Sequence, residues 1–128
     1  MKVVIGSAII LLAVLVIGVS VIPKNNEPLT ELYFDDHTNL PKEAEINKEY
    51  NFSFTVHNLE YKKMLYDYEI TLEYDNKKFL VIRGTLELEN EETQQIKSGF
   101  TIKQEFERAK ITVNIVNKKQ AIHFWVNK

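Results

Sequence analysis

The sequence contains no cysteine. This excludes disulfide bonds and also a lipoprotein anchor, which is attached through a cysteine. Exported domains often depend on disulfides, so an exported domain of this composition must be stable through packing alone. The sequence also has no internal repeat and no low-complexity tract.

The common catalytic motifs are missing as well. There is no P-loop, no G-x-G-x-x-G and no H-E-x-x-H. Ser53 and Ser98 are the only serines after residue 20, and neither lies in a G-x-S-x-G elbow. Carboxylates far apart in the chain can still meet in a cleft, but a compact sandwich seldom has one. We therefore predict that the chain is not an enzyme and binds no cofactor.

Charge of one sign is also lacking. The chain has 16 basic and 18 acidic residues, for a net charge of −2, and the two signs are interspersed. Nucleic acid binding requires a basic surface, so nucleic acid is not expected as a partner.

The first feature present is an apolar run from Val3 to Ile22, 20 residues without a charge. As a helix it would be about 30 Å long, the thickness of the hydrocarbon core of a bilayer. We predict a transmembrane helix over residues 1–23, a signal anchor that contacts the membrane through residues 3–22. A cleavable signal peptide is the alternative, with Lys2 as its basic region and Gly18-Val19-Ser20 as its small residues. In either case the rest of the chain is expected to be extracytoplasmic.

Proline ends the helix and a short stalk follows. Pro23 cannot continue a helix, and residues 24–28 are polar or proline. Such a stalk would hold the next segment close to the lipid headgroups. Residues 29–128 are enough for one domain with one core and too few for two.

From Leu29 onward apolar residues recur at every second position. Tyr50–Val56 and Tyr66–Tyr74 show this alternation most clearly. A strand places such residues on one face, whereas a helix would scatter them. The other predicted strands are Leu29–Phe34, Phe79–Ile82, Thr85–Leu88, Ile96–Ile102, Lys110–Val116 and Ala121–Val126.

Turn-forming residues separate these runs, and no helical pattern lies between them. Seven or eight short strands with this spacing indicate an all-β antiparallel sandwich of the immunoglobulin or fibronectin type III kind. We expect a bulge or bend at Gly84 and at Gly99. The predicted core is Tyr50, Phe52, Phe54, Tyr68, Ile70, Leu72, Val81, Phe100, Ile102, Ile111, Val113, Ile115, Phe124 and Trp125.

The potential metal ligands favour structural roles. Asp35-Asp36-His37 are consecutive and follow a strand, which is typical of a solvated turn, so no metal site is predicted. His57 and His123 lie at or near strands, where a ring nitrogen usually bonds to the backbone.

Exposed aromatic residues are the best candidates for contact with a partner. Tyr and Trp are common in interaction hot spots, and we name Tyr61, Tyr66, Tyr74 and Trp125 as possible interface residues. Asn51-Phe52-Ser53 matches the N-glycosylation pattern, so Asn51 is a possible glycosylation site.

Three segments of the exported part resemble a known family. They are Leu29–Phe34, Asn39-Leu40-Pro41 and the stretch from Tyr50 to Glu60, which all lie between residues 29 and 60. They resemble the membrane proteins of domain of unknown function 1616, found mainly in archaea, whose exported domain opens with a T-E-F-Y strand, a loop and a strand that ends in an asparagine-centred turn. Family members often have several membrane helices, whereas one is predicted here. The resemblance implies a sandwich domain outside an archaeal-type membrane and supplies no catalytic residue.

An anchor, a sandwich and the missing catalytic motifs together favour a membrane-tethered interaction module. Its partner would be another envelope protein or a cell-surface polymer. The alternative is a pilin-like filament subunit, with the apolar helix in the filament core and the β domain outside.

Overall fold

The computed structural model describes residues 27–128. The predicted transmembrane helix over residues 1–23 and most of the stalk lie outside the described residues. Within residues 27–128, no helix has both the length and the apolar character needed to cross a bilayer. The elements are β1 Leu29–Phe34, η1 His37–Asn39, β2 Glu49–Leu59, β3 Met64–Tyr74, β4 Lys77–Leu88, β5 Thr93–Thr101, β6 Arg108–Ile115, η2 Val116–Lys118 and β7 Gln120–Asn127.

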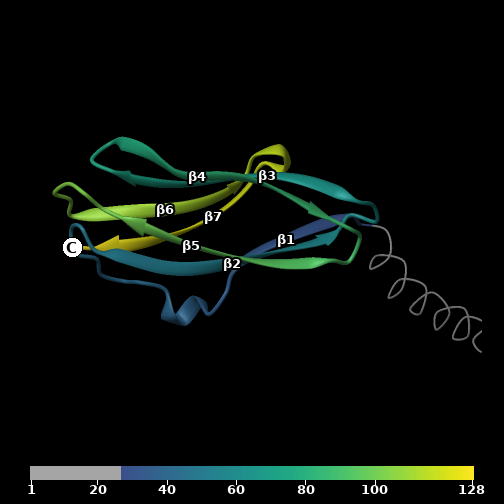
Figure 1. The fold of residues 1–128 in the computed structure, drawn as a ribbon, viewed down its shortest axis with the longest axis horizontal. Helices are drawn as coiled ribbons and strands as arrows, with labels where there is room; N and C mark the ends of the chain where they lie inside the picture. Colours follow the sequence, from purple (N-terminus) through teal and green to yellow (C-terminus); the bar gives the residue numbers. More distant parts are fainter. Residues whose placement is uncertain (1–26) are drawn as a thin grey trace, which may run out of the picture.

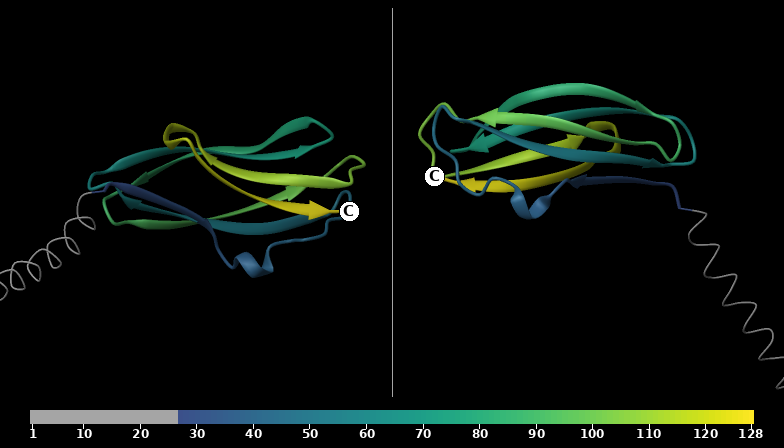
Figure 2. Two further views of the ribbon diagram at one scale, coloured as in Figure 1. Left: turned by 180° about the vertical axis from the view of Figure 1, so that it is seen from behind. Right: turned by 60° about the horizontal axis from the view of Figure 1, so that its bottom comes forward.

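The seven strands form two stacked antiparallel sheets (Figure 1). Sheet A has three strands in the order β1-β2-β5, and sheet B has four in the order β4-β3-β6-β7. The short helix η1 lies outside the two layers (Figure 2). An all-β antiparallel sandwich was predicted, and this is confirmed.

Alternating side chains build the core between the sheets. On β6, Ala109, Ile111, Val113 and Ile115 are fully buried, while the residues between them are not. The inward side chains of β2 show the same one-sided burial, including Phe54 and Val56 at 0% exposure. A strand with one face against a second sheet requires this pattern.

One prediction about the core is wrong. Trp125 is 41% exposed because it lies on the outer face of sheet B. Three other predicted core residues, Tyr50, Tyr68 and Val81, are partly buried and pack against the core.

The turn between β3 and β4 explains how that hairpin closes. Tyr74 pairs with Lys77, which leaves Asp75 and Asn76 as a two-residue loop. Both have positive φ, 52° and 60°, which is the conformation of the type I′ turn that suits the twist of a hairpin.

The runs predicted as two strands, Phe79–Ile82 and Thr85–Leu88, form the single strand β4. Gly84 does not bend it. Its role is to leave room for Tyr68 on β3, because a Cβ at position 84 would lie 2.5 Å from the Tyr68 ring. The register shift lies instead at Val81, between the pairs Ile70–Ile82 and Thr71–Leu80.

Candidate binding groove

One long side of the sandwich is open. It lies between β4 and β5, which are edge strands of sheets B and A. A groove of about 780 Å³ runs along this side. Leu72, Tyr74 and Phe100 contribute to its lining, with Phe79–Ile82 on one bank and Lys97–Thr101 on the other. We call this the β4–β5 groove.

The unequal number of strands explains why the groove is apolar. Phe79 pairs with Leu72 and Ile82 pairs with Ile70, and both partners are buried, so Phe79 and Ile82 face the interior side of sheet B. The extra residue at Val81 allows two residues three positions apart to share a face. Sheet A has no fourth strand opposite them, and they stay 36% and 45% exposed.

Leu80 lies at the rim of the groove. It is 54% exposed and pairs with Thr71, so its side chain faces the outer side of sheet B. Phe79 faces inward and stacks on Tyr74 with 5.2 Å between the ring centroids. Edge strands usually carry charges or other features that prevent pairing with another chain. Three exposed large apolar residues on one edge strand therefore mark β4 as a surface for contact.

The charged residues of the groove are mostly basic. Lys97 and Lys103 line it together with a single carboxylate, Glu49. None of these three forms an ion pair within residues 27–128. The groove thus combines an apolar wall with an excess of positive charge.

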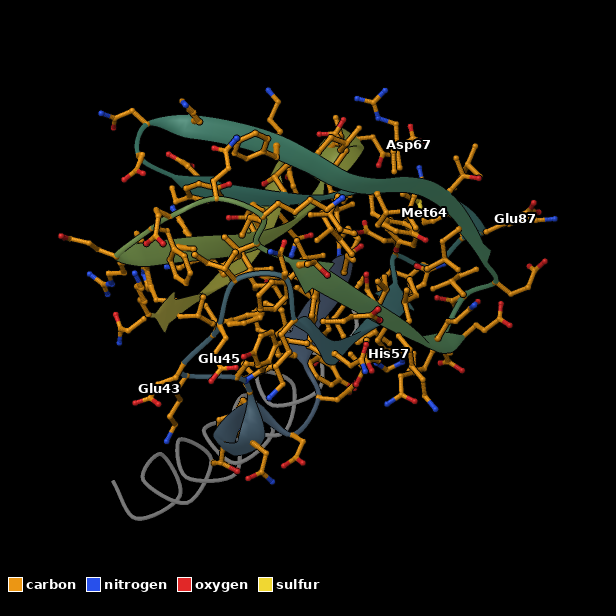
Figure 3. The ribbon with its side chains drawn as sticks, turned by 60° about the vertical axis from the view of Figure 1, so that its left-hand side comes forward. Glu43, Glu45, His57, Met64, Asp67 and Glu87 are labelled. Carbon is orange, nitrogen blue, oxygen red and sulfur yellow. The ribbon has the colours of Figure 1, made fainter. Side chains whose placement is uncertain are left out.

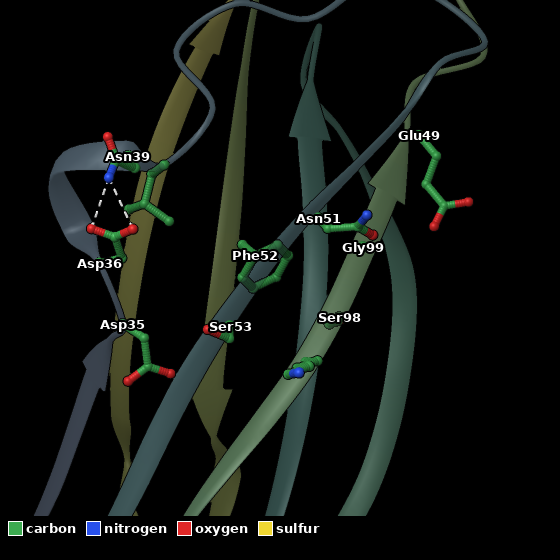
Figure 4. A pocket seen from close by; sticks show the side chains of 11 residues that line it. Asp35, Asp36, Asn39, Glu49, Asn51, Phe52, Ser53, Ser98 and Gly99 are labelled. Atoms are coloured by element: carbon green, nitrogen blue, oxygen red, sulfur yellow. Dashed lines mark hydrogen bonds between the residues drawn. The ribbon is translucent and has the colours of Figure 1, made fainter.

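A second hollow, of about 650 Å³, lies on the outer face of sheet A beside η1. It shares Glu49, Lys97, Ser98 and Gly99 with the β4–β5 groove, so the two meet at the edge of β5. Figure 4 shows the polar side chains around it. Asn51 lies here opposite Gly99, where a Cβ would approach the Asn51 amide oxygen to 2.8 Å.

The segment Asp35-Asp36-His37 forms a turn at the end of β1, and its carboxylates serve structural roles. Both Asp36 carboxylate oxygens accept hydrogen bonds of 2.9 Å from the Asn39 side chain (Figure 4). Asp35 accepts hydrogen bonds from Thr55 and Gln95, at 2.6 and 3.0 Å. Burial raises the pKa of the Asp35 carboxyl, but these hydrogen bonds outweigh burial and hold the pKa below its ordinary value. In residues 27–128, no three potential ligands gather in a way that suits a metal ion.

Two of the four predicted interface residues are buried, which corrects that prediction. Tyr66 is 0% exposed, and its hydroxyl lies 2.8 Å from Thr30 Oγ1. Tyr74 is 5% exposed and packs against Phe79 and Phe106. Tyr66 is enclosed in the core and cannot contact a partner, whereas Tyr74 reaches the surface only at the floor of the β4–β5 groove.

The other two predicted interface residues are exposed but far apart. Tyr61 is 52% exposed and lies in the loop after β2. Trp125 is 41% exposed and lies near the end of β7, at the opposite end of the sandwich. The Arg108 guanidinium lies 4.0 Å from the centroid of the Trp125 ring, a cation–π contact. The structure does not bring Tyr61 and Trp125 into one surface.

The remaining predicted residues are placed as follows. Asn51 is exposed on the outer face of sheet A, and its glycosylation stays a prediction. His57 bonds through Nδ1 to the Glu31 carboxylate at 2.8 Å, and the predicted bond to the backbone is wrong. His123 is exposed beside Trp125.

The β4–β5 groove was not predicted, although a signal for it is present. Phe79-Leu80-Val81-Ile82 is a continuous run of four apolar residues, whereas β2 and β6 alternate. An uninterrupted run indicates a strand buried on both faces or a strand that contacts something else. β4 is an edge strand, which leaves the second explanation.

Comparisons with known proteins identify the fold. No family model matches the chain, and no curated protein matches it. The chain is similar to a β-glucosidase from Listeria innocua, with a TM-score of 0.65 and 16% identity over 78% of this chain. The match spans 16% of the glucosidase, so this chain corresponds to a small part of that enzyme.

Similar structures also include a much shorter protein. The CARDB domain of a Pyrococcus furiosus protein, solved in complex with di-metal ions, has a TM-score of 0.57 and 15% identity. That match covers 80% of this chain and 89% of the domain. An alkylpurine DNA glycosylase from Pseudomonas fluorescens, bound to DNA with an abasic site analog, has a TM-score of 0.58 and 13% identity, over 80% of this chain and 31% of the glycosylase. At these identities the likeness shows a β-sandwich fold and nothing more. The resemblance to domain of unknown function 1616 stays a prediction.

Proposed function

We propose that this chain is a membrane-tethered extracytoplasmic module of the immunoglobulin-like group that binds an extended segment of another envelope protein in the β4–β5 groove. The tether is the apolar run Val3–Ile22. The observation that supports binding is the partly uncovered interior face of β4, where Phe79 and Ile82 are 36% and 45% exposed. The CARDB domain of the Pyrococcus furiosus protein is matched over 89% of its length, which supports a module of about the size of one such domain.

The groove suits an extended polypeptide better than other partners. Both of its banks are edge strands, which offer unpaired backbone groups to an added strand. A strand laid against either bank would place alternate side chains on the apolar wall. Lys97 and Lys103 favour acidic residues in that segment. We therefore expect a partner segment with apolar residues at every second position and acidic residues beside them.

We also propose that the module acts by binding and not by catalysis. Acid–base hydrolysis of the two-carboxylate type requires a pair of acids across the reacting bond, and within the described residues the groove lining offers one, Glu49. The similarity to glycosidase and glycosylase structures gives no argument for activity, since identity is at most 17% in these matches.

Selection of displayed peptides against the full chain in lipid nanodiscs would test the proposal. A library of random linear peptides is the probe. We expect the enriched peptides to show alternating apolar residues with acids, and to protect the backbone amides of β4 or β5 from hydrogen exchange.

Matched variants decide where such peptides bind. Ile82→Asp places a charge in the groove, and Tyr33→Asp places one at an equally exposed apolar residue outside the groove, since both side chains are 45% exposed. Ile82→Asp should weaken binding at least tenfold, because each tenfold corresponds to about 1.4 kcal/mol and a carboxylate on the apolar wall costs more than that. Tyr33→Asp should have no effect. Equal binding by the native chain and Ile82→Asp, or selection of carbohydrate polymers but no peptide in a parallel glycan screen, contradicts the proposal.

A further inference from the structure

Three exposed apolar residues lie at the end of the sandwich where the described chain begins. Leu29 is 50% exposed, Leu65 is 57% exposed and Val116 is 44% exposed. They come from the start of β1, the start of β3 and η2, which are distant in the sequence. The fold brings apolar side chains from three elements to one end, and the C-terminus lies at the other end (Figure 1).

Leu29 faces the outer side of sheet A and Leu65 the outer side of sheet B, so they flank this end from two faces. Hydrogen bonds connect the elements that carry the three residues. The Asn117 side chain donates to the Leu65 carbonyl at 2.7 Å and accepts from the Asp67 backbone N–H at 3.0 Å. This fixes Val116 beside the start of β3.

A second group of bonds ties η2 to the start of β1. Lys118 Nζ lies 3.0 Å from Glu60 Oε2, and the same oxygen accepts a hydrogen bond from Thr30, next to Leu29. Gln120 Nε2 donates to the Thr30 carbonyl at 3.0 Å. The apolar side chains therefore share a rigid base.

The charges around this surface divide into two groups. Lys62 and Lys119 are exposed and form no ion pair within the described residues. Glu87 and Glu89 pair with Lys63, on the β4 side of the same end. Glu87 is the residue opposite Leu65 in the pairing of β3 with β4, and Asp67 and Glu87 both lie at the molecular surface (Figure 3). Lys119 directly follows η2, whereas these two carboxylates lie on β3 and β4.

The chain outside the described residues determines what this end faces. Residues 1–26 join the sandwich here, and they include the apolar run Val3–Ile22. If that run spans a membrane, the five residues 24–28 can extend over at most about 18 Å. Leu29 is then held within that distance of the lipid headgroups.

We propose that Leu29, Leu65 and Val116 dock this end of the sandwich on the outer lipid surface, with Lys62 and Lys119 at the phosphates. The proposal rests on the membrane tether of the proposed function. Apolar side chains enter the headgroup region while lysine stems extend toward it with their amines at the phosphates. Docking fixes the orientation of the module, and the banks of the β4–β5 groove, Phe79–Ile82 and Lys97–Thr101, point away from the membrane.

Because the native chain has no cysteine, single cysteine variants can be labelled cleanly. Leu65→Cys and Val116→Cys would be labelled with an environment-sensitive fluorophore in the full chain, reconstituted in vesicles of phosphatidylcholine and phosphatidylglycerol. Leu80→Cys is the matched control, since Leu80 is equally apolar and 54% exposed. Labels at 65 and 116 should shift to the blue and be quenched by lipids with nitroxide-labelled chains, and the label at 80 should not.

Flotation after an alkaline wash measures the tether separately. A chain that floats while its labels at 65 and 116 stay unquenched overturns the docking and leaves the tether intact. A chain that is lost from the vesicles overturns the tether, and with it the docking.

Charge reversal tests the role of the lysines. Lys62→Glu and Lys119→Glu should each reduce the docked population about fivefold, since a lysine near an anionic surface contributes about that factor. Vesicles of phosphatidylcholine alone should remove this difference. If charge reversal leaves quenching unchanged in anionic vesicles, the assignment of the two lysines to lipid phosphates is wrong.

Discussion

The two long sides of the sandwich are built differently. On the β1–β7 side, Phe34 from sheet A contacts Phe124 from sheet B edge to face, with 5.2 Å between the ring centroids. The segment after η1 then pairs with the end of β7, where Ala44 N donates to the Asn127 carbonyl and Asn127 N donates to the Lys42 carbonyl, both at 2.9 Å. Glu43 and Glu45, on the same segment, point into solvent (Figure 3). No comparable segment of the described chain pairs with β4.

In the described part of this sandwich, an irregular segment covers the gap between the edges of the two sheets on one side only. Residues 42–44 close the β1–β7 side at its far end. On the β4–β5 side nothing in residues 27–128 takes that role, and Phe79 and Ile82 on the interior face of β4 stay 36% and 45% exposed. The open side is thus the part of the fold where a partner strand would complete the packing.

Replacing one phenylalanine on each side should give the largest difference in the free energy of unfolding. Phe124 is 8% exposed and contacts the rings of Phe34, Phe52 and Phe100. Phe124→Ala should lower the free energy of unfolding by about 3–5 kcal/mol. Phe79→Ala should cost about 1–2 kcal/mol, because much of that ring is already in water. Urea unfolding of the full chain in micelles, followed by Trp125 fluorescence, measures both values. Equal losses would mean that the β4–β5 side is packed as tightly as the other.

At the end where β1 begins, replacing Lys118 or Lys63 should give a smaller difference in the free energy of unfolding. Lys118 pairs with Glu60, whose side chain is 8% exposed, whereas Lys63 is 57% exposed. Lys118→Met should lower the free energy of unfolding by about 1–2 kcal/mol, since it leaves a mostly buried carboxylate without its cation. Lys63→Met should produce no measurable change. The same urea titration compares the two variants. If Lys63→Met lowers the free energy of unfolding more than Lys118→Met does, the Lys118–Glu60 pair is not the more stabilising one.

Most of the fold follows from local patterns in the sequence. Alternation predicts β1 with its observed bounds, because Thr30, Leu32 and Phe34 face the core while their neighbours face out. The register of β4 could not be predicted. Gly84 is explained by the ring of Tyr68 on β3 and not by a bend in its own strand, and contacts of that kind depend on which strands become neighbours.

The groove could be predicted only in part. The run Phe79–Ile82 is visible in the sequence, but its exposure depends on the number of strands in the opposite sheet. The prediction of Tyr66 and Tyr74 as interface residues failed for a reason that the sequence contains. Both lie in phase with Ile70 and Leu72 on β3, so the alternation that predicts the strand also places them in the core.

Acid should weaken the β1–β7 side through Glu60. Burial raises the pKa of the Glu60 carboxyl, but the hydrogen bond from Thr30 and the ion pair with Lys118 outweigh burial and hold the pKa below its ordinary value of 4.5. A carboxyl with a lowered pKa in the folded state stabilises the fold above the unfolded pKa, and this contribution is lost as the pH falls through the folded value. The free energy of unfolding should therefore be constant with respect to this group above about pH 5 and should fall below about pH 4.5.

Glu60→Gln separates this effect from the other carboxyls. The variant should be less stable than the native chain near neutral pH and should lose less stability on acidification. Urea titrations between neutral pH and pH 3 would measure both slopes. Parallel slopes for the two chains would show that Glu60 does not contribute to the acid response.

A lysine introduced on β4 should change the free energy of unfolding less than a lysine introduced on β7. Leu80 is 54% exposed on β4, and Leu80→Lys should change the free energy of unfolding by less than about 0.5 kcal/mol. Ile122 on β7 packs against the core, and Ile122→Lys should cost more, because it forces an ammonium group toward the buried ring of Phe124 or out of register. The urea titration again compares them. If Leu80→Lys costs more than about 1 kcal/mol, this part of the β4 edge is already covered in the free chain, and the edge proposed for a partner strand is not open.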